Sequence, residues 1–134
     1  MSSMQPRKAL IIDDDDDVRE ILTVLLEWRG FEVDSMRDGI DAVRLGKTYD
    51  VILLDLRMPV FDGERLADYW ELTTPATLDR VIILSGYSGY TRGRKLPTFA
   101  TLDKPFDHME LLRLVEACAP LSVQNNECVR KTDA

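Results

Sequence analysis

The chain contains at positions 50–59 the stretch Asp50-Val51-Ile52-Leu53-Leu54-Asp55-Leu56-Arg57-Met58-Pro59. Its apolar run from Val51 to Leu54 is typical of a strand buried on both faces of a parallel sheet, and a Pro-containing turn follows. Asp55 is therefore expected at the carboxyl end of a central strand. Ligands bind at that edge of open α/β sheets, so Asp55 is a candidate nucleophile or metal ligand. The alternative is an aspartate that only caps a turn.

The composition indicates one compact domain without a membrane span. The chain has 134 residues, 45% of them apolar, and no apolar run approaches the length needed to cross a bilayer. The first residues lack the apolar middle of a secretory signal, so we expect a cytoplasmic protein with no membrane partner. The net charge of −7 argues against a nucleic-acid partner. Cys118 and Cys128 have neither zinc-ligand nor disulfide-framework spacing.

Apolar strands alternate with helical patterns along the chain, which predicts a three-layer α/β/α domain with a five-stranded parallel sheet. We expect one of the later aspartates in the run Asp13 to Asp17 to cap the first helix, and Gly30 to end it. The strands are expected at 9–12, 31–35, 51–54, 81–84 and 99–102. The helices are expected at about 18–29, 40–45, 62–70 and 109–118, with Pro120 ending the last one.

The segment 86–97 interrupts this alternation, because it is rich in Gly, Tyr and Arg and has no apolar stripe. Its helix, the fourth in the domain, is expected to be shortened or irregular. The basic cluster at 92–95 is interpreted as a solvated loop rather than an anion site. Residues 1–7 and 120–134 are expected to be an N-terminal tail and a C-terminal tail or linker remnant around a domain at 8–119.

Five polar side chains follow strand ends or the turn after the last strand. Because parallel strands share one carboxyl edge, we expect these residues to lie together: Asp13, Asp14, Asp55, Ser85 and Lys104. Three adjacent carboxylates repel one another, and a hard divalent cation, most plausibly Mg²⁺, relieves that repulsion. Taken singly, each has a simpler interpretation as a helix cap, a turn hydroxyl or a surface ammonium.

Over residues 8–119 the chain resembles the receiver domain of bacterial two-component response regulators, and it is similar to the receivers of hybrid sensor kinases. The pieces that carry the resemblance are Leu10-Ile11-Ile12-Asp13-Asp14, Leu53-Leu54-Asp55-Leu56-Arg57-Met58-Pro59 with Asp62-Gly63, Ile82-Ile83-Leu84-Ser85-Gly86, and Lys104-Pro105-Phe106. The resemblance implies the flavodoxin-like strand order 2-1-3-4-5.

The resemblance also implies a role for each site residue. Asp55 would accept a phosphoryl group from a phosphohistidine on a sensor histidine kinase or phosphotransfer protein. Asp14, Asp55 and the backbone carbonyl of Arg57 would hold Mg²⁺, with Asp13 helping directly or through water. Lys104 would neutralise one phosphoryl oxygen, and Ser85 would hydrogen-bond another. The protein would then be a signalling domain rather than an enzyme, although it takes part in its own phosphorylation and dephosphorylation.

One position departs from the family pattern, because Thr101 stands where the switch aromatic is usual. Tyr87, Tyr90 or Phe99 could replace that ring, or serve only in packing. We therefore expect phosphorylation to act by ordering the segment 86–97, next to Ser85, rather than through a rotamer change in the fifth strand.

The main alternative function is a Mg²⁺-dependent phosphohydrolase of haloacid-dehalogenase type that forms an aspartyl-phosphate. Those enzymes carry a second aspartate two positions after the nucleophile, where this chain has Arg57. A third possibility is a degenerate receiver that only binds partners, which the presence of all five site residues weakens. A receiver would signal through contacts with a downstream protein, and could form a homodimer.

Overall fold

The computed structural model describes residues 5–56, 63–85, 90–91, 94–95 and 97–121. Its main sheet has five parallel strands in the order β2-β1-β3-β4-β7, which confirms the predicted order 2-1-3-4-5. β3 is the central strand, paired with β1 on one side and β4 on the other. The strands are β1 (Lys8–Ile12), β2 (Glu32–Met36), β3 (Val51–Asp55), β4 (Val81–Ser85) and β7 (Ala100–Asp103).

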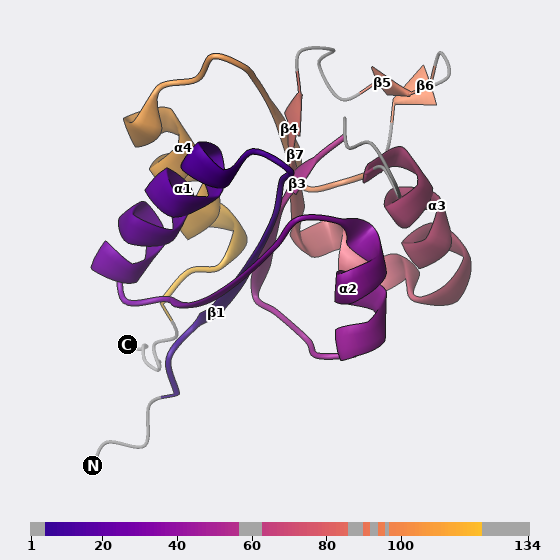
Figure 1. Ribbon diagram of the computed structural model, residues 1–134, viewed down its shortest axis with the longest axis horizontal. Coiled ribbons are helices and arrows are strands. Elements are labelled where there is room, and N and C mark those ends of the chain that lie inside the picture. Colours follow the sequence, from indigo (N-terminus) through magenta and orange to yellow (C-terminus); the bar gives the residue numbers. More distant parts are fainter. Residues whose placement is uncertain (1–4, 57–62, 86–89, 92–93, 96, 122–134) are drawn as a thin grey trace, which may run out of the picture.

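Helices cover both faces of this sheet, as Figure 1 shows. On one face lie α1 (Asp16–Trp28) and α4 (His108–Cys118); on the other lie α2 (Gly39–Leu45), α3 (Gly63–Thr73) and the 3₁₀ helix η1 (Pro75–Arg80). Successive residues of β3 alternate between the two cores, with Leu53 packed on the α1/α4 side and Leu54 on the α2/α3 side. Both faces are buried, which explains the continuous apolar run.

Aspartates begin three of the helices, as their short acceptor side chains favour. Asp15, the third of the five consecutive aspartates, accepts hydrogen bonds from the backbone N–H groups of Asp17 and Val18 at the start of α1. Asp38 and Asp107 cap α2 and α4 in the same way. Gly30 follows α1 with φ at 90°, a conformation in which a Cβ would be strained. The predicted cap and stop of the first helix are confirmed.

The segment after β4 differs from the irregular helix that the sequence predicts. Its described residues form a short antiparallel pair, β5 (Tyr90–Thr91) with β6 (Arg94–Lys95). Without an apolar stripe a helix here has no face to bury, whereas a hairpin pairs the backbone groups locally. The rest of 86–96 lies outside the described residues, as do Cys128 and most of the two expected tails.

Two further features were not predicted. The 3₁₀ helix η1 joins α3 to β4. Arg7, which we expected to belong to the N-terminal tail, is anchored: its guanidinium donates to Glu116 Oε1, at 2.6 Å, and to the carbonyls of Ala119 and Arg29, both at 2.8 Å. Within the described part of the chain, no helix combines the length and apolar character that a membrane crossing needs.

Candidate functional site

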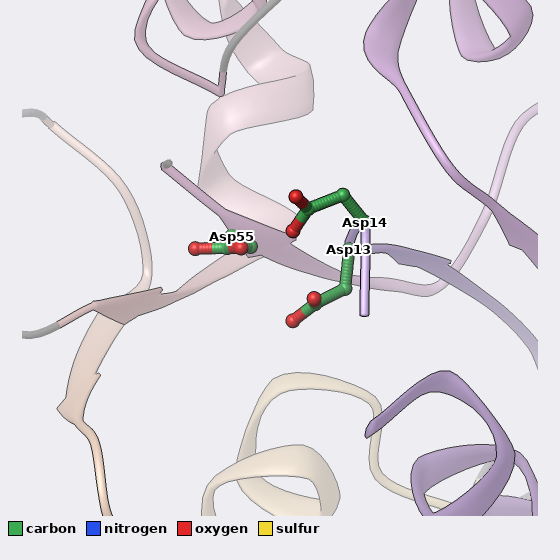
Figure 2. Close-up of side chains that lie close together, drawn as sticks. All are labelled: Asp13, Asp14 and Asp55. Atoms are coloured by element: carbon green, nitrogen blue, oxygen red, sulfur yellow. The ribbon is translucent and has the colours of Figure 1, made fainter. Parts of the chain in front are cut away.

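The strand register brings three aspartates to the carboxyl edge of the sheet. Ile12 is opposite Leu54 in the β1–β3 pair, so Asp13 and Asp14 leave β1 beside the position where Asp55 ends β3. Figure 2 shows the three carboxylates converging from these two strand ends. One oxygen of each lies within 4.8 Å of one from each of the others. This juxtaposition is the one that the sequence predicts.

Burial makes the cluster electrostatically costly. Asp13 is 1% exposed and Asp55 is 5% exposed, so two of the three carboxylates are almost removed from water. A buried carboxylate needs opposite charge or hydrogen-bond donors to stay ionised. Three oxygen donors within this spacing match the preference of a hard divalent cation such as Mg²⁺. The donor set therefore fits such an ion.

Lys104 supplies one positive charge to the cluster from the turn after β7. Its ammonium lies 3.2 Å from Asp13 Oδ2 and 3.8 Å from Asp55 Oδ2, and its side chain is one-third exposed. The Lys104–Pro105 peptide bond is cis. One ammonium against three carboxylates leaves these four residues with net negative charge, which suits a cation.

The region around Asp13 is held by contacts that the sequence analysis missed. The backbone N–H of Asp15 donates to Asp13 Oδ1 at 2.9 Å, and Arg19 Nη1 donates to the carbonyl oxygen of Asp13 at 2.8 Å. Arg19 is also paired with Asp16. The five consecutive aspartates thus have separate roles, because some belong to the acidic cluster, one caps α1 and others lie in the first turn of α1. The one feature of the sequence that could have indicated this contact is the arginine, Arg19, one turn into the predicted helix.

Gly63 brings the start of α3 against the strand end that carries Asp55. A Cβ at position 63 would lie 2.3 Å from the carbonyl oxygen of Asp55 and 2.7 Å from the Cα of Leu56. The Gly63 N–H donates to the Leu56 carbonyl at 3.2 Å. Only glycine permits this approach without moving the backbone behind Asp55.

The remaining predicted site residues are described in part. Ser85 ends β4 with its backbone opposite Asp103, while its side chain lies outside the described part, as does all of Arg57. Thr101, at the usual position of the switch aromatic, lies half-buried in β7 opposite Ile83. Of the candidate replacement rings, Phe99 is 40% exposed. The side chains of Tyr87 and Tyr90 are outside the described residues.

Residues 9–116 match the family model of the response regulator receiver domain. The chain is 30% identical over 113 residues to the transcriptional regulatory protein CpxR homolog of Haemophilus influenzae, covering 82% of this chain and 49% of that protein. It is 31% identical over 115 residues to protein Rrf1 of Nitratidesulfovibrio vulgaris, covering 83% and 81% of the two chains. The chain thus spans about half the length of the first of these relatives and most of the second.

Solved structures share the fold. The receiver domain of a sensor histidine kinase from Pseudomonas aeruginosa, with magnesium coordinated in its active-site cleft, superposes with a TM-score of 0.75 at 26% identity, covering 86% of this chain and 98% of that one. The response regulator TrrA from Thermotoga maritima, in complex with Mg²⁺ and BeF, gives 0.71 at 27% identity, covering 84% and 98%.

Proposed function

We propose that this chain, which belongs to the response regulator receiver domain family, accepts a phosphoryl group on Asp55 from a phosphohistidine of a sensor histidine kinase or phosphotransfer protein. The observation that carries the proposal is the placement of Asp55. It is buried at the end of the central strand, shares an acidic cluster with Asp13 and Asp14, and lies 3.8 Å from the ammonium of Lys104.

The chemistry follows from these groups. A carboxylate oxygen of Asp55 forms a bond to phosphorus while the bond from phosphorus to the donor imidazole nitrogen breaks, and the imidazole leaves with that electron pair. Phosphoryl transfer depends mainly on positioning and on neutralising the phosphoryl oxygens. Lys104 would neutralise one of these oxygens, and the family resemblance assigns another to the hydroxyl of Ser85. Asp13, Asp14, Asp55 and the carbonyl of Arg57 would hold Mg²⁺, which supplies positive charge to the same oxygens.

The partners and limits of the domain follow from the same premise. The receiver extends over 8–119, works in the cytoplasm and signals through contacts with a downstream protein, either alone or as a homodimer. With a net charge of −7, the chain itself does not contact nucleic acid. The hydrolase alternative loses support, because Arg57 replaces the second aspartate that it needs.

The test is phosphotransfer from a phosphorylated histidine-kinase core in the presence of Mg²⁺, followed by intact mass. Asp55→Asn should abolish the base-labile phosphoryl adduct. Asp50→Asn, at the exposed other end of the same strand, is the matched control and should be phosphorylated like the unmodified protein. An adduct on Asp55→Asn equal to that of the unmodified protein would sink the assignment.

A further inference from the structure

A cavity of about 240 Å³ lies on the α2/α3 face, toward the amino-terminal ends of the strands and away from the acidic cluster. Figure 1 shows α2 and α3 on the same face of the sheet. The floor is formed by Leu10 and Ile52, neighbours across β1 and β3. The walls come from the two helices and the segments after them, and include Ala42, Tyr49, Trp70 and Arg80.

One cavity-lining group is unsatisfied among the described residues. The Nε atom of Arg80, at the end of η1, is buried and has no hydrogen-bond partner there. Leaving a buried donor without an acceptor is unfavourable, and more so when the group is charged. The guanidinium is planar and always charged, and it is suited to a carboxylate that accepts two parallel hydrogen bonds. Nε itself is covered, so an acceptor in the cavity would have to pair with the outer nitrogens of the Arg80 guanidinium.

Two other polar side chains at the cavity, Tyr49 and Lys47, are already matched. Tyr49 donates its hydroxyl to Asp34 Oδ2 at 2.6 Å, and the ammonium of Lys47 lies 3.5 Å from the same oxygen. Asp34 therefore accounts for both of these groups. Arg80 is left as the cavity's source of unmatched positive charge within the described part of the chain.

We propose that this cavity binds a small aromatic carboxylate, with its ring among Leu10, Ile52 and Trp70 and its carboxylate on Arg80. A dry cavity of about 150 Å³ is enough to hold benzene, so 240 Å³ has room for one ring with a carboxylate attached. Apolar walls with a few placed polar groups are typical of small-molecule sites. A free phosphate fits less well, because it would leave the apolar floor uncovered and bring more charge than one guanidinium matches.

The two tryptophans allow a test with an internal control. Trp70 is 8% exposed and lines the cavity, whereas Trp28 is 77% exposed at the end of α1 on the opposite face. In ¹H–¹⁵N spectra of the full chain, titration with benzoate should shift the indole N–H signal of Trp70 saturably and leave that of Trp28 in place. Benzamide, a neutral molecule of the same shape, should bind at least tenfold more weakly, and inorganic phosphate should leave Trp70 unmoved.

Two variants test separately the contributions of the Arg80 charge and of the cavity volume to binding. Arg80→Gln should weaken benzoate binding at least tenfold while leaving benzamide binding unchanged. Ala42→Leu, which narrows the cavity from α2 and keeps the charge of Arg80, should abolish both, and it keeps the test decisive if Arg80→Gln does not fold. The proposal is overturned if benzoate and benzamide bind equally, if Ala42→Leu binds benzoate as the unmodified protein does, or if benzoate shifts only signals around Asp13, Asp55 and Lys104.

Discussion

The two ends of the sheet differ in how well their charged side chains are paired with opposite charge. At the amino end, the guanidinium of Arg7 has three oxygen acceptors and lies 4.1 Å from the centre of the Phe31 ring. At the carboxyl end, the ammonium of Lys104 lies beside the carboxylates of Asp13 and Asp55, and Asp14 adds a third carboxylate to the cluster. The first arrangement leaves little to gain from a ligand. In the second, a bound cation would relieve the repulsion among the carboxylates, so we expect the amino end mainly to stabilise the fold and the carboxyl end to respond to a ligand.

The largest effect on stability should come from the paired end. Arg7→Met should lower the free energy of unfolding by about 3 kcal/mol, because it removes charge-assisted hydrogen bonds and leaves Glu116 without its closest cation. The variant should still be phosphorylated on Asp55, at a rate close to that of the unmodified protein. Urea denaturation followed by circular dichroism measures the first, and phosphotransfer measures the second.

Arg29→Met is the matched control for that variant. Its more exposed guanidinium lies 3.5 Å from the same carboxylate, so its removal should cost less than about 1 kcal/mol. Equal losses for the two variants would mean that the paired end is no more stabilising than an ordinary surface ion pair, and the contrast between the two ends would fail.

At the acidic end, Mg²⁺ should stabilise the fold by relieving repulsion among the three aspartates. At 100 times its dissociation constant the ion should contribute about 2.7 kcal/mol, if the unfolded chain does not bind it. Thermal unfolding with MgCl₂, against NaCl of equal ionic strength, measures the shift. A midpoint that does not respond to millimolar Mg²⁺ would contradict a shared cation site.

A smaller effect distinguishes the members of the cluster. In the absence of Mg²⁺, Asp14→Asn should stabilise the protein by about 1 kcal/mol, because it removes one of three like charges. Asp13→Asn should stabilise the protein less, since Asp13 also accepts hydrogen bonds from Lys104 and from the Asp15 N–H. Both variants should bind Mg²⁺ more weakly. Chemical denaturation in EDTA ranks the two, and the reverse order would show that repulsion and burial at Asp13 outweigh the hydrogen bonds that it accepts.

The smallest effect concerns the pH dependence of stability and lies at the amino end, where the Cys118 thiol contacts the carbonyl of Asp50 just before β3. Burial raises the pKa of the Cys118 thiol to about 11, with Asp50 adding to the rise and Arg80 opposing it. Because the pKa of this thiol is higher in the folded than in the unfolded chain, the folded protein loses stability as the pH rises from the unfolded pKa to the folded pKa, here from about 9 to 11. Cys118→Ala should flatten that decline slightly. If the slope is unchanged, Tyr49, whose pKa is also raised by burial and Asp34, is the more important group.

Sequence reasoning reached the fold and the acidic cluster for one physical reason. Apolar periodicity fixes which segments are strands, and parallel strands must place Asp13, Asp14 and Asp55 at one edge. It failed where no periodic signal exists. The hairpin at β5 and β6 replaces a helix, and the contacts of Arg7 with Glu116 join residues 109 positions apart. Nothing in the local sequence around an arginine reveals partners at that distance.

The close approach of Gly63 bears on how mutational maps of this domain are interpreted. Its missing side chain leaves room for the Asp55 carbonyl, so alanine at 63 would push directly on the backbone of Asp55. In a saturation scan for signalling, position 63 should therefore tolerate substitution as poorly as position 55, although it carries no chemical group. A ranking by intolerance alone would count it among the reacting residues. Chemical rescue by an added small molecule distinguishes position 63 from a position that carries a reacting group. A small molecule can replace a missing group, but it cannot restore the space that a methyl group at position 63 occupies.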